Sequence, residues 1–451
     1  MVAYVPALEQ CEWLAPTFFV ASRSRAIAYD GRIRITRRAR VAEDLVSRRE
    51  QLRVPRYLVA VASAAFALKI AIALCTYGST DVLIYEADLT KIRQEGAVAL
   101  YRDGITTRWC GQPGQRACPP FIHPPFIVHA LRGWGVLADL SGLPLRFWLR
   151  FTSAVADVGS LVLLVRLLRA RRQDPQTGIS LALFAASPIA LLISGFHGNT
   201  DPILVFFLLL SICLVEGRRS AWLAGVALGM AVNVKILPVL LVPAVLLALP
   251  GVRQRIEFCV GAAAVVLVGS LPTLVAAPEV IITRVMGYGS QSGPWGLALV
   301  AMVLQNPHLA WLHDLHARYG KLMALGVVLG SSWWPRSRAF QSALFTRAGF
   351  LLFLFLSLTP GFGVQYLAWL APWVVALGVR TTATYYLAGA VFLFAYYTAA
   401  AGGFLWDLAN SLERFPWTPV VLGLGLICWM VICVITLRFA GSLRASAGEG
   451  T

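Results

Sequence analysis

The chain has 451 residues, is 58% hydrophobic, and carries a formal net charge of +17 with a mean hydropathy of +0.70. This hydrophobic content exceeds the roughly 45–50% of soluble domains, so it excludes an ordinary soluble enzyme and predicts an all-α polytopic membrane protein. The basic residues lie in short clusters between apolar runs, without interleaved aromatic residues, so they indicate membrane topology and we expect no nucleic-acid partner.

The N-terminal segment, residues 1–55, is rich in arginine. Eleven arginines lie between residues 23 and 56, and the short apolar run before them lacks the charged start of a signal peptide. The positive-inside rule therefore predicts a cytoplasmic segment, which is a simpler explanation than binding to nucleic acid or lipid headgroups.

Residues 56–438 are expected to form the transmembrane domain, followed by a cytoplasmic tail at 439–451. Apolar runs predict about twelve spans, several of them shorter than the usual length of roughly 17 to 25 residues. They are expected at 57–77, 148–169, 179–195, 201–217, 220–233, 236–250, 256–276, 318–334, 340–358, 364–379, 382–400 and 416–438. The basic clusters between them then lie on the cytoplasmic side.

Residues 78–147 form the expected first outer loop. Its stretch "FIHPPFIVHALRGWGVLADL" (121–140) is interpreted as an interfacial or re-entrant segment in which Pro124 and Pro125 open a helix. The alternative is a true span, but a span there would move the next basic cluster, "RLLRARR" (166–172), to the outer side of the membrane. Cys110 and Cys118 enclose a short Gly/Pro-containing turn in this loop, and a disulfide between them is predicted.

With this topology, polar residues collect on the outer face. Asp81 and Asp88, the loop "GFHGNTD" (195–201), Lys235, and the Gly/Pro-containing segments 282–296 and 359–369 all emerge there. Irregular polar segments on one side, opposite plain basic turns, predict one composite site that faces outward.

Asp81 is the candidate general base for an acceptor hydroxyl, because it follows the first span directly. The alternative is that it only caps a loop helix. Asp88 lies seven residues further on and would share a helical face with it, as a supporting carboxylate.

Lys235, between two short apolar runs, is placed to meet a lipid phosphate at headgroup level, or only to extend towards bulk headgroups. Arg284 is a second candidate ligand for the donor phosphate. His197 and Asp201 can orient a sugar hydroxyl or form a structural hydrogen bond. Gln291 and Gln365, in the outer segments, are expected to contact substrate.

The six histidines show no paired metal-ligand spacing, so no metal site is predicted, although a divalent cation as cofactor stays open. Lys69 and Asp157 both lie inside predicted spans. We expect them to neutralise each other rather than to form a proton relay.

The stretches "STDVLIYEADLTKIRQEGAVALYRDG" (79–104) and "HPPF" (123–126) resemble the opening of GT-C type integral-membrane glycosyltransferases, especially mannosyltransferases that use polyprenyl-phosphate mannose, among them GPI mannosyltransferase I. The resemblance implies that Asp81, Tyr85 and Tyr101 belong to the site, with Tyr85 contacting substrate. The segments "GFHGNTD", "KILPVLLVP", "GPWG" and "TPGFGVQYLAW" are also similar to what such enzymes carry.

The resemblance further implies a GT-C-like helix bundle that transfers a sugar, with mannose favoured, from a polyprenyl-phosphate donor to a hydroxyl of a glycan, lipid or protein acceptor. We expect this on the outer face of a bacterial plasma (inner) membrane, in contact with membrane lipids. The rival class is a polytopic transporter or lipid flippase, but no internal repeat is evident. A membrane scaffold protein is a third alternative.

Overall fold

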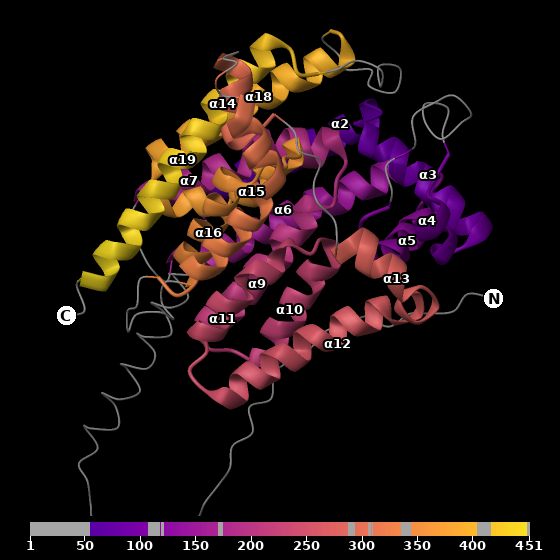
Figure 1. The fold of residues 1–451 in the computed structure, drawn as a ribbon, viewed down its shortest axis with the longest axis horizontal. Coiled ribbons are helices and arrows are strands. Elements are labelled where there is room, and N and C mark those ends of the chain that lie inside the picture. The colour runs from indigo at the N-terminus through magenta and orange to yellow at the C-terminus, as the bar shows by residue number, and fades with distance from the viewer. Residues whose placement is uncertain are drawn as a thin grey trace, which may run out of the picture. The chain divides into compact units, whose positions relative to one another are not determined.

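The computed structural model describes residues 55–106, 118, 121–169, 175–286, 294–304, 308, 310–334, 344–403 and 416–448. These residues belong to one compact unit, Val54–Thr451. Within them every regular element is a helix (Figure 1), which confirms the all-α prediction for this part of the chain. The predicted N-terminal segment lies almost wholly outside the described residues.

The first part of the described chain runs through α2 (Arg56–Cys75), α3 (Thr80–Glu95), α4 (Ala97–Asp103), α5 (Phe126–Ser141), α6 (Leu145–Arg169), α7 (Pro175–Ala185), α8 (Pro188–Ala190), the π-helix η1 (Leu191–His197), α9 (Asp201–Glu216), α10 (Ala221–Val234), η2 (Leu237–Leu241) and α11 (Val242–Ala248). It continues through α12 (Val252–Ala276), α13 (Pro278–Val280), η3 (Ile281–Met286), α14 (Gly296–Leu304), α15 (Ala310–Ser331), α16 (Leu344–Leu358), η5 (Val364–Tyr366), α17 (Leu367–Leu370), η6 (Trp373–Leu377), α18 (Val379–Ala401) and α19 (Pro419–Gly448).

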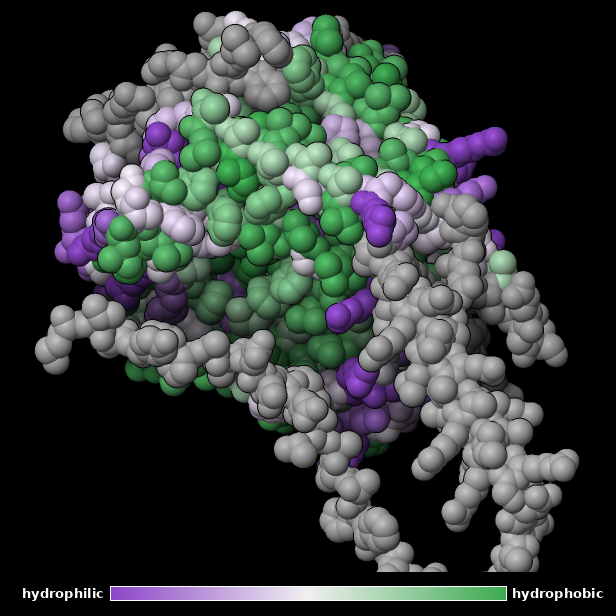
Figure 2. Space-filling model, turned by 180° about the vertical axis from the view of Figure 1, so that it is seen from behind, coloured by the Kyte–Doolittle hydropathy of each residue, from purple (hydrophilic) through white to green (hydrophobic). Residues whose placement is uncertain are grey.

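Within these described ranges, five helical segments are long and apolar enough to cross a membrane: 56–75, 145–168, 176–197, 252–276 and 419–445. Three shorter apolar helical segments, 221–234, 237–248 and 344–358, also match predicted spans. Figure 2 shows hydrophobic residues across much of the face drawn there, with hydrophilic residues gathered towards its edges. The structure therefore supports a helical membrane protein, and the count of twelve spans stays a prediction.

Some helix boundaries differ from the predicted ones. The span expected at 364–379 is three short helices, η5, α17 and η6, because Pro372 lacks the backbone N–H that a continuous helix needs and Gly378 has a φ of +90°. Helix α14 was not predicted, and α15 begins at Ala310 instead of 318. Helix α19 continues to Gly448, through the expected start of the C-terminal tail.

The predicted first outer loop contains α3, α4 and α5, which lie together in Figure 1. Helix α5 begins after Pro124 and Pro125, as expected. It buries Ile127 and Leu131 on one face, while Leu140 stays 81% exposed. An exposed apolar side chain on such a helix suits an interfacial position, which remains a prediction. Cys118 is disulfide-bonded, but Cys110 lies outside the described residues, so their pairing also remains a prediction.

Helices α10 and α12 pack closely where glycines meet the facing backbone. A Cβ at Gly225 would lie 2.0 Å from the carbonyl oxygen of Phe258, and a Cβ at Gly261 would lie 2.5 Å from that of Trp222. Small residues of this kind let membrane helices approach each other closely. The contact fixes α10, and Lys235 caps the C-terminal end of that helix.

Candidate functional site

Asp81 lies in the first turn of α3, where the positive end of the helix dipole favours a carboxylate. The residue that caps this helix is Ser79, whose hydroxyl accepts a hydrogen bond from the backbone N–H of Asp81 at 3.2 Å. The same hydroxyl donates to the carbonyl oxygen of His197 at 2.6 Å. The interpretation of Asp81 as a mere helix cap is therefore wrong, because Ser79 does this and leaves the carboxylate for other contacts.

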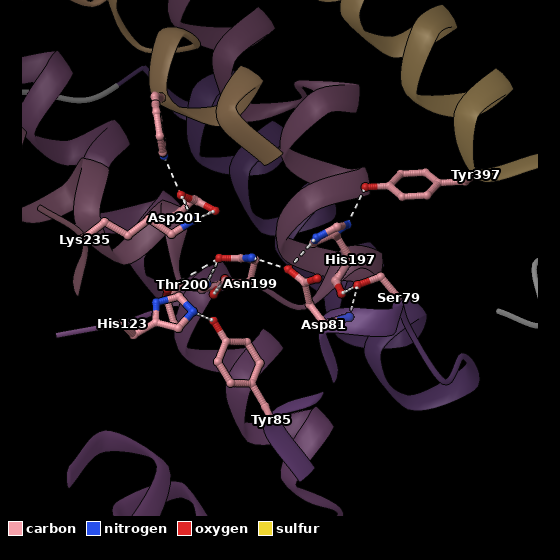
Figure 3. A network of polar contacts seen from close by, with 12 residues as sticks. Ser79, Asp81, Tyr85, His123, His197, Asn199, Thr200, Asp201, Lys235 and Tyr397 are labelled. Carbon is pink, nitrogen blue, oxygen red and sulfur yellow. Dashed lines mark hydrogen bonds and ion pairs between the residues drawn. The ribbon is translucent and has the colours of Figure 1, made fainter. Parts of the chain in front are cut away.

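One oxygen of the Asp81 carboxylate is anchored (Figure 3). Its Oδ2 accepts from Nδ2 of Asn199 at 2.5 Å and contacts Nε2 of His197 at 3.1 Å, while Nδ1 of His197 lies 2.8 Å from the hydroxyl of Tyr397. None of the described residues hydrogen-bonds to Oδ1, and the side chain is 29% exposed. Oδ1 is therefore open to accept a hydrogen bond from a substrate.

The charge of Asp81 is stabilised by its neighbours. Burial raises the pKa of this carboxyl, but the combined effects of His197, Lys235 and Asn199 outweigh burial and lower the pKa to about 2. Asp81 is therefore ionised at neutral pH.

Lys235 supplies the positive charge of the site. Its ammonium lies 2.8 and 2.9 Å from the two carboxylate oxygens of Asp201, which also accepts a hydrogen bond from Nε1 of Trp369. The ring of Trp369 stacks on Tyr366 at 3.9 Å, and the Lys235 ammonium lies 5.3 Å from the centroid of Tyr366 and 5.6 Å from that of Trp369. Asp201 is fully buried, so it holds the ammonium in place while the Lys235 side chain remains 16% exposed.

A second contact joins α3 to the end of α10. The hydroxyl of Tyr85 lies 3.1 Å from Nε2 of His123, and the hydroxyl of Tyr101 donates to the His123 carbonyl oxygen. Burial lowers the pKa of His123 to about 4, the charge of Lys235 adding to the effect, although a hydrogen bond to the backbone of Val234 opposes it. His123 is therefore neutral at neutral pH and connects the site tyrosines to the residue that precedes Lys235.

Asp88 is two turns further along α3 and almost fully buried, at 2% exposure. Its Oδ2 has no hydrogen-bond partner among the described residues, and burial raises its pKa to about 8. No hydrogen bond or ion pair between described residues joins Asp88 to the network around Asp81. The carboxyl is consequently protonated at neutral pH, unlike that of Asp81.

The remaining predicted residues lie apart from this network or outside the described chain. Gln365 on η5 and Arg284 on η3 are half-buried, and no hydrogen bond or ion pair between described residues connects either to Asp81 or Lys235. Gln291 lies outside the described residues. Within the described ranges, no three His, Cys, Asp or Glu side chains form a group that can hold a metal ion, so the divalent cation gains no ligand set.

Lys69 and Asp157 form the predicted ion pair at 2.5 Å, joining α2 to α6. The Asp157 carboxylate also accepts a hydrogen bond from the Ser194 hydroxyl of η1. Both charges are thereby neutralised inside the bundle, which confirms the expected pairing.

Sequence reasoning missed several residues of the site, among them His123, Asn199, Trp369 and Tyr397. His123 and Asn199 lie in the quoted motifs "HPPF" and "GFHGNTD", and Trp369 lies in "TPGFGVQYLAW", so a reading that treated each polar or aromatic side chain of these motifs as a candidate would have found them. Tyr397 lies inside an apolar run and carries no such signal.

Comparison with known families gives a match over part of the chain. Residues 121–283 match the model of glycosyltransferase family 87. The matched range covers a little over a third of the chain and includes His123, His197, Asp201 and Lys235, while Asp81 precedes it. The match supports a membrane glycosyltransferase of the GT-C type. No curated protein matches the chain.

Proposed function

We propose that this protein is a membrane glycosyltransferase that moves a sugar, with mannose favoured, from a polyprenyl-phosphate carrier to a hydroxyl of a glycan, lipid or protein acceptor. The proposal places the site on the outer face of a bacterial plasma membrane. The observation that carries it is the Asp81 carboxylate, with Oδ2 held by His197 and Asn199 and Oδ1 open, and with the cation of Lys235 near enough to lower its pKa. The family match within residues 121–283 supports the same reaction class.

In the proposed reaction, the acceptor hydroxyl donates a hydrogen bond to Oδ1 of Asp81 and its oxygen attacks the anomeric carbon of the donor sugar. The new glycosidic bond forms as the bond between the sugar and the carrier phosphate breaks, and the hydroxyl proton passes to Asp81. A carboxylate with a pKa of about 2 is a weak base for a free alcohol. It is sufficient here, because a hydroxyl that has largely bonded to the anomeric carbon is a strong acid.

Lys235 is proposed to stabilise the departing lipid phosphate, which gains negative charge in the transition state. Asp201 and Trp369 keep the ammonium in position, so little reorganisation is needed when that charge develops. Arg284 is proposed as a second phosphate ligand, although no hydrogen bond or ion pair among the described residues joins it to Lys235 or Asp81. The carrier tail stays in the bilayer, beside apolar helices such as α12, where Val268 is 77% exposed.

The decisive experiment incubates the purified full-length protein in detergent with a panel of labelled polyprenyl-phosphate sugars and candidate acceptors. We expect release of polyprenyl phosphate and transfer of label, most readily with mannose. If neither occurs with any sugar in the panel, the proposal is wrong.

A transporter or lipid flippase is the second candidate, because the Lys69–Asp157 pair places two charged groups inside the bundle. Proteoliposomes loaded with labelled polyprenyl-phosphate sugar distinguish the two functions. A flippase exposes the lipid on the opposite leaflet with the sugar still attached, whereas a transferase separates sugar from carrier.

A further inference from the structure

Arg150, in α6, is fully buried and makes five hydrogen bonds to uncharged oxygen atoms. Its Nη2 donates to the carbonyl oxygens of Ala73 and Thr76, each at 2.9 Å. Its Nη1 donates to the Thr76 hydroxyl at 2.9 Å and to the Gly195 carbonyl oxygen at 3.5 Å. Its Nε donates to the Arg146 carbonyl oxygen at 3.0 Å. The planar guanidinium thus bonds to oxygens of α2, of η1 and of its own helix α6, three helices that the single ammonium of a lysine cannot bridge.

Two of these helices lead directly to the candidate site. Thr76 caps the C-terminal end of α2, five residues before Asp81, and Gly195 lies in η1, two residues before His197. Carbonyl oxygens at a helix C-terminus lack partners within the helix and carry partial negative charge, so a buried cation suits them. Arg150 therefore connects the backbone that carries Asp81 to the backbone that carries His197.

The two segments also contact each other tightly beside Arg150. The backbone N–H of Ser79 donates to the His197 carbonyl oxygen at 3.2 Å, in addition to the bond from the Ser79 hydroxyl. Gly78 and Gly198 have φ angles of +106° and +77°, and a Cβ on either would lie within 3.0 Å of Val82. No side chain fits at these two positions, so the backbone follows the surface of Arg150 and Val82 closely.

We infer that Arg150 is a positioning residue for the proposed sugar transfer, fixing the Asp81 segment against the His197 segment so that Oδ1 points to the acceptor. The inference rests on the proposed function. It differs from a purely structural role in what a substitution changes. Substitution of a residue that only stabilises the fold lowers the amount of folded protein but leaves the turnover of each folded molecule unchanged.

Arg150→Lys is the test variant, since it keeps the charge but cannot bridge both segments. Arg347→Lys is the matched control. Arg347 is also a buried arginine, and it donates to the carbonyl oxygens of Ser332 and Trp334, which lie in a segment without candidate site residues. The measurements are kcat and donor KM per folded molecule, together with amide hydrogen exchange by mass spectrometry.

For Arg150→Lys we expect kcat to fall by about 10- to 100-fold, because small displacements of a catalytic group have effects of that order. Donor KM, set by Lys235, should change by less than about twofold. Exchange should accelerate in segments 76–82 and 195–201 and not elsewhere. Arg347→Lys should keep the wild-type kcat and accelerate exchange only near its own contacts.

The inference is overturned if Arg150→Lys keeps the wild-type kcat, or if exchange in those two segments is unchanged or rises no more than in the rest of the chain. If this variant does not fold, Thr76→Val, which removes one acceptor of the Arg150 guanidinium, is measured in the same way with the same criteria. Failure of the proposed function is recognised separately, as a wild-type protein that transfers no sugar. The exchange measurement then still decides whether Arg150 ties the two segments together.

Discussion

Replacing Asp81 by Asn is the sharpest test of the proposed chemistry, because the change removes the base and keeps the shape. The amide oxygen of Asp81→Asn can take the place of Oδ2 and accept from Asn199 and His197, so the network of hydrogen bonds is retained. The NH2 group then occupies the place of Oδ1. There it donates a hydrogen bond where the reaction needs an acceptor for the hydroxyl proton.

Loss of a positioned general base lowers turnover by roughly 10² to 10⁴-fold. This range corresponds to about 3 to 6 kcal/mol of activation free energy, at about 1.4 kcal/mol for each factor of ten. Lys235 is unchanged in the variant, so donor affinity should stay near the wild-type value. The assay follows release of labelled polyprenyl phosphate at saturating donor, with donor binding measured separately.

Asp139→Asn is the matched control. Asp139 lies at the end of α5, is 62% exposed, and pairs only with Arg93 among the described residues, so its loss should leave turnover unchanged. The reasoning is refuted if Asp81→Asn keeps turnover within about a factor of three of wild type. If Asp88→Asn is inactive at the same time, the roles of the two carboxylates are reversed.

Three further predictions concern charge and packing around the site. Lys235→Ala should weaken donor binding and also lower the melting temperature, because it leaves the buried Asp201 charge unpaired. The double variant Lys235→Met with Asp201→Asn should recover the melting temperature but not donor affinity. Recovery of donor affinity in the double variant would contradict the role of Lys235. Asp88→Asn should melt at the same temperature as wild type near pH 4, and at an increasingly higher temperature than wild type as the pH rises to about 8. The reason is that the pKa of Asp88 rises from 3.8 to about 8 on folding, so above the lower value the charged form destabilises the folded wild type. A difference in melting temperature that is the same at about pH 4 and about pH 8 would contradict this. Gly225→Val should lower the melting temperature and raise donor KM, because the added side chain forces α10 away from α12. The control Gly326→Val has open space around it and should lower the melting temperature much less. Equal changes in melting temperature for the two variants would refute the packing argument.

The sequence identified the parts of the site that carry charge at the ends of apolar runs. Asp81 and Lys235 were predicted for this reason, and His197 and Asp201 for the short polar loop they share. The structure pairs Asp81 with His197 and Lys235 with Asp201, and the charge of Lys235 also acts on Asp81. A charged or polar group at a membrane boundary is conspicuous because the surrounding sequence is apolar.

The aromatic partners were not predicted, for the opposite reason. Tyr397 lies inside an apolar run and Trp369 ends a quoted motif. In both places an aromatic ring is the expected core residue, and only the folded arrangement shows that their polar atoms bond to His197 and Asp201. Likewise, Arg150 lies in a predicted span without a local pattern that reveals its carbonyl partners. Spans interrupted by proline and glycine, such as 364–379, were predicted as continuous because hydropathy does not register helix breaks.

The hydrogen bond between His197 and Tyr397 joins residues 200 positions apart in the chain. A ribosome makes the chain from its N-terminus, and Asp81 and His197 therefore emerge long before Tyr397. The neighbour of His197 on α18 must still be translated when α2 and α6 have already been made. A nascent chain that stops before α18 therefore lacks the hydroxyl that bonds to His197, so this contact of the site is completed only when synthesis has passed this helix.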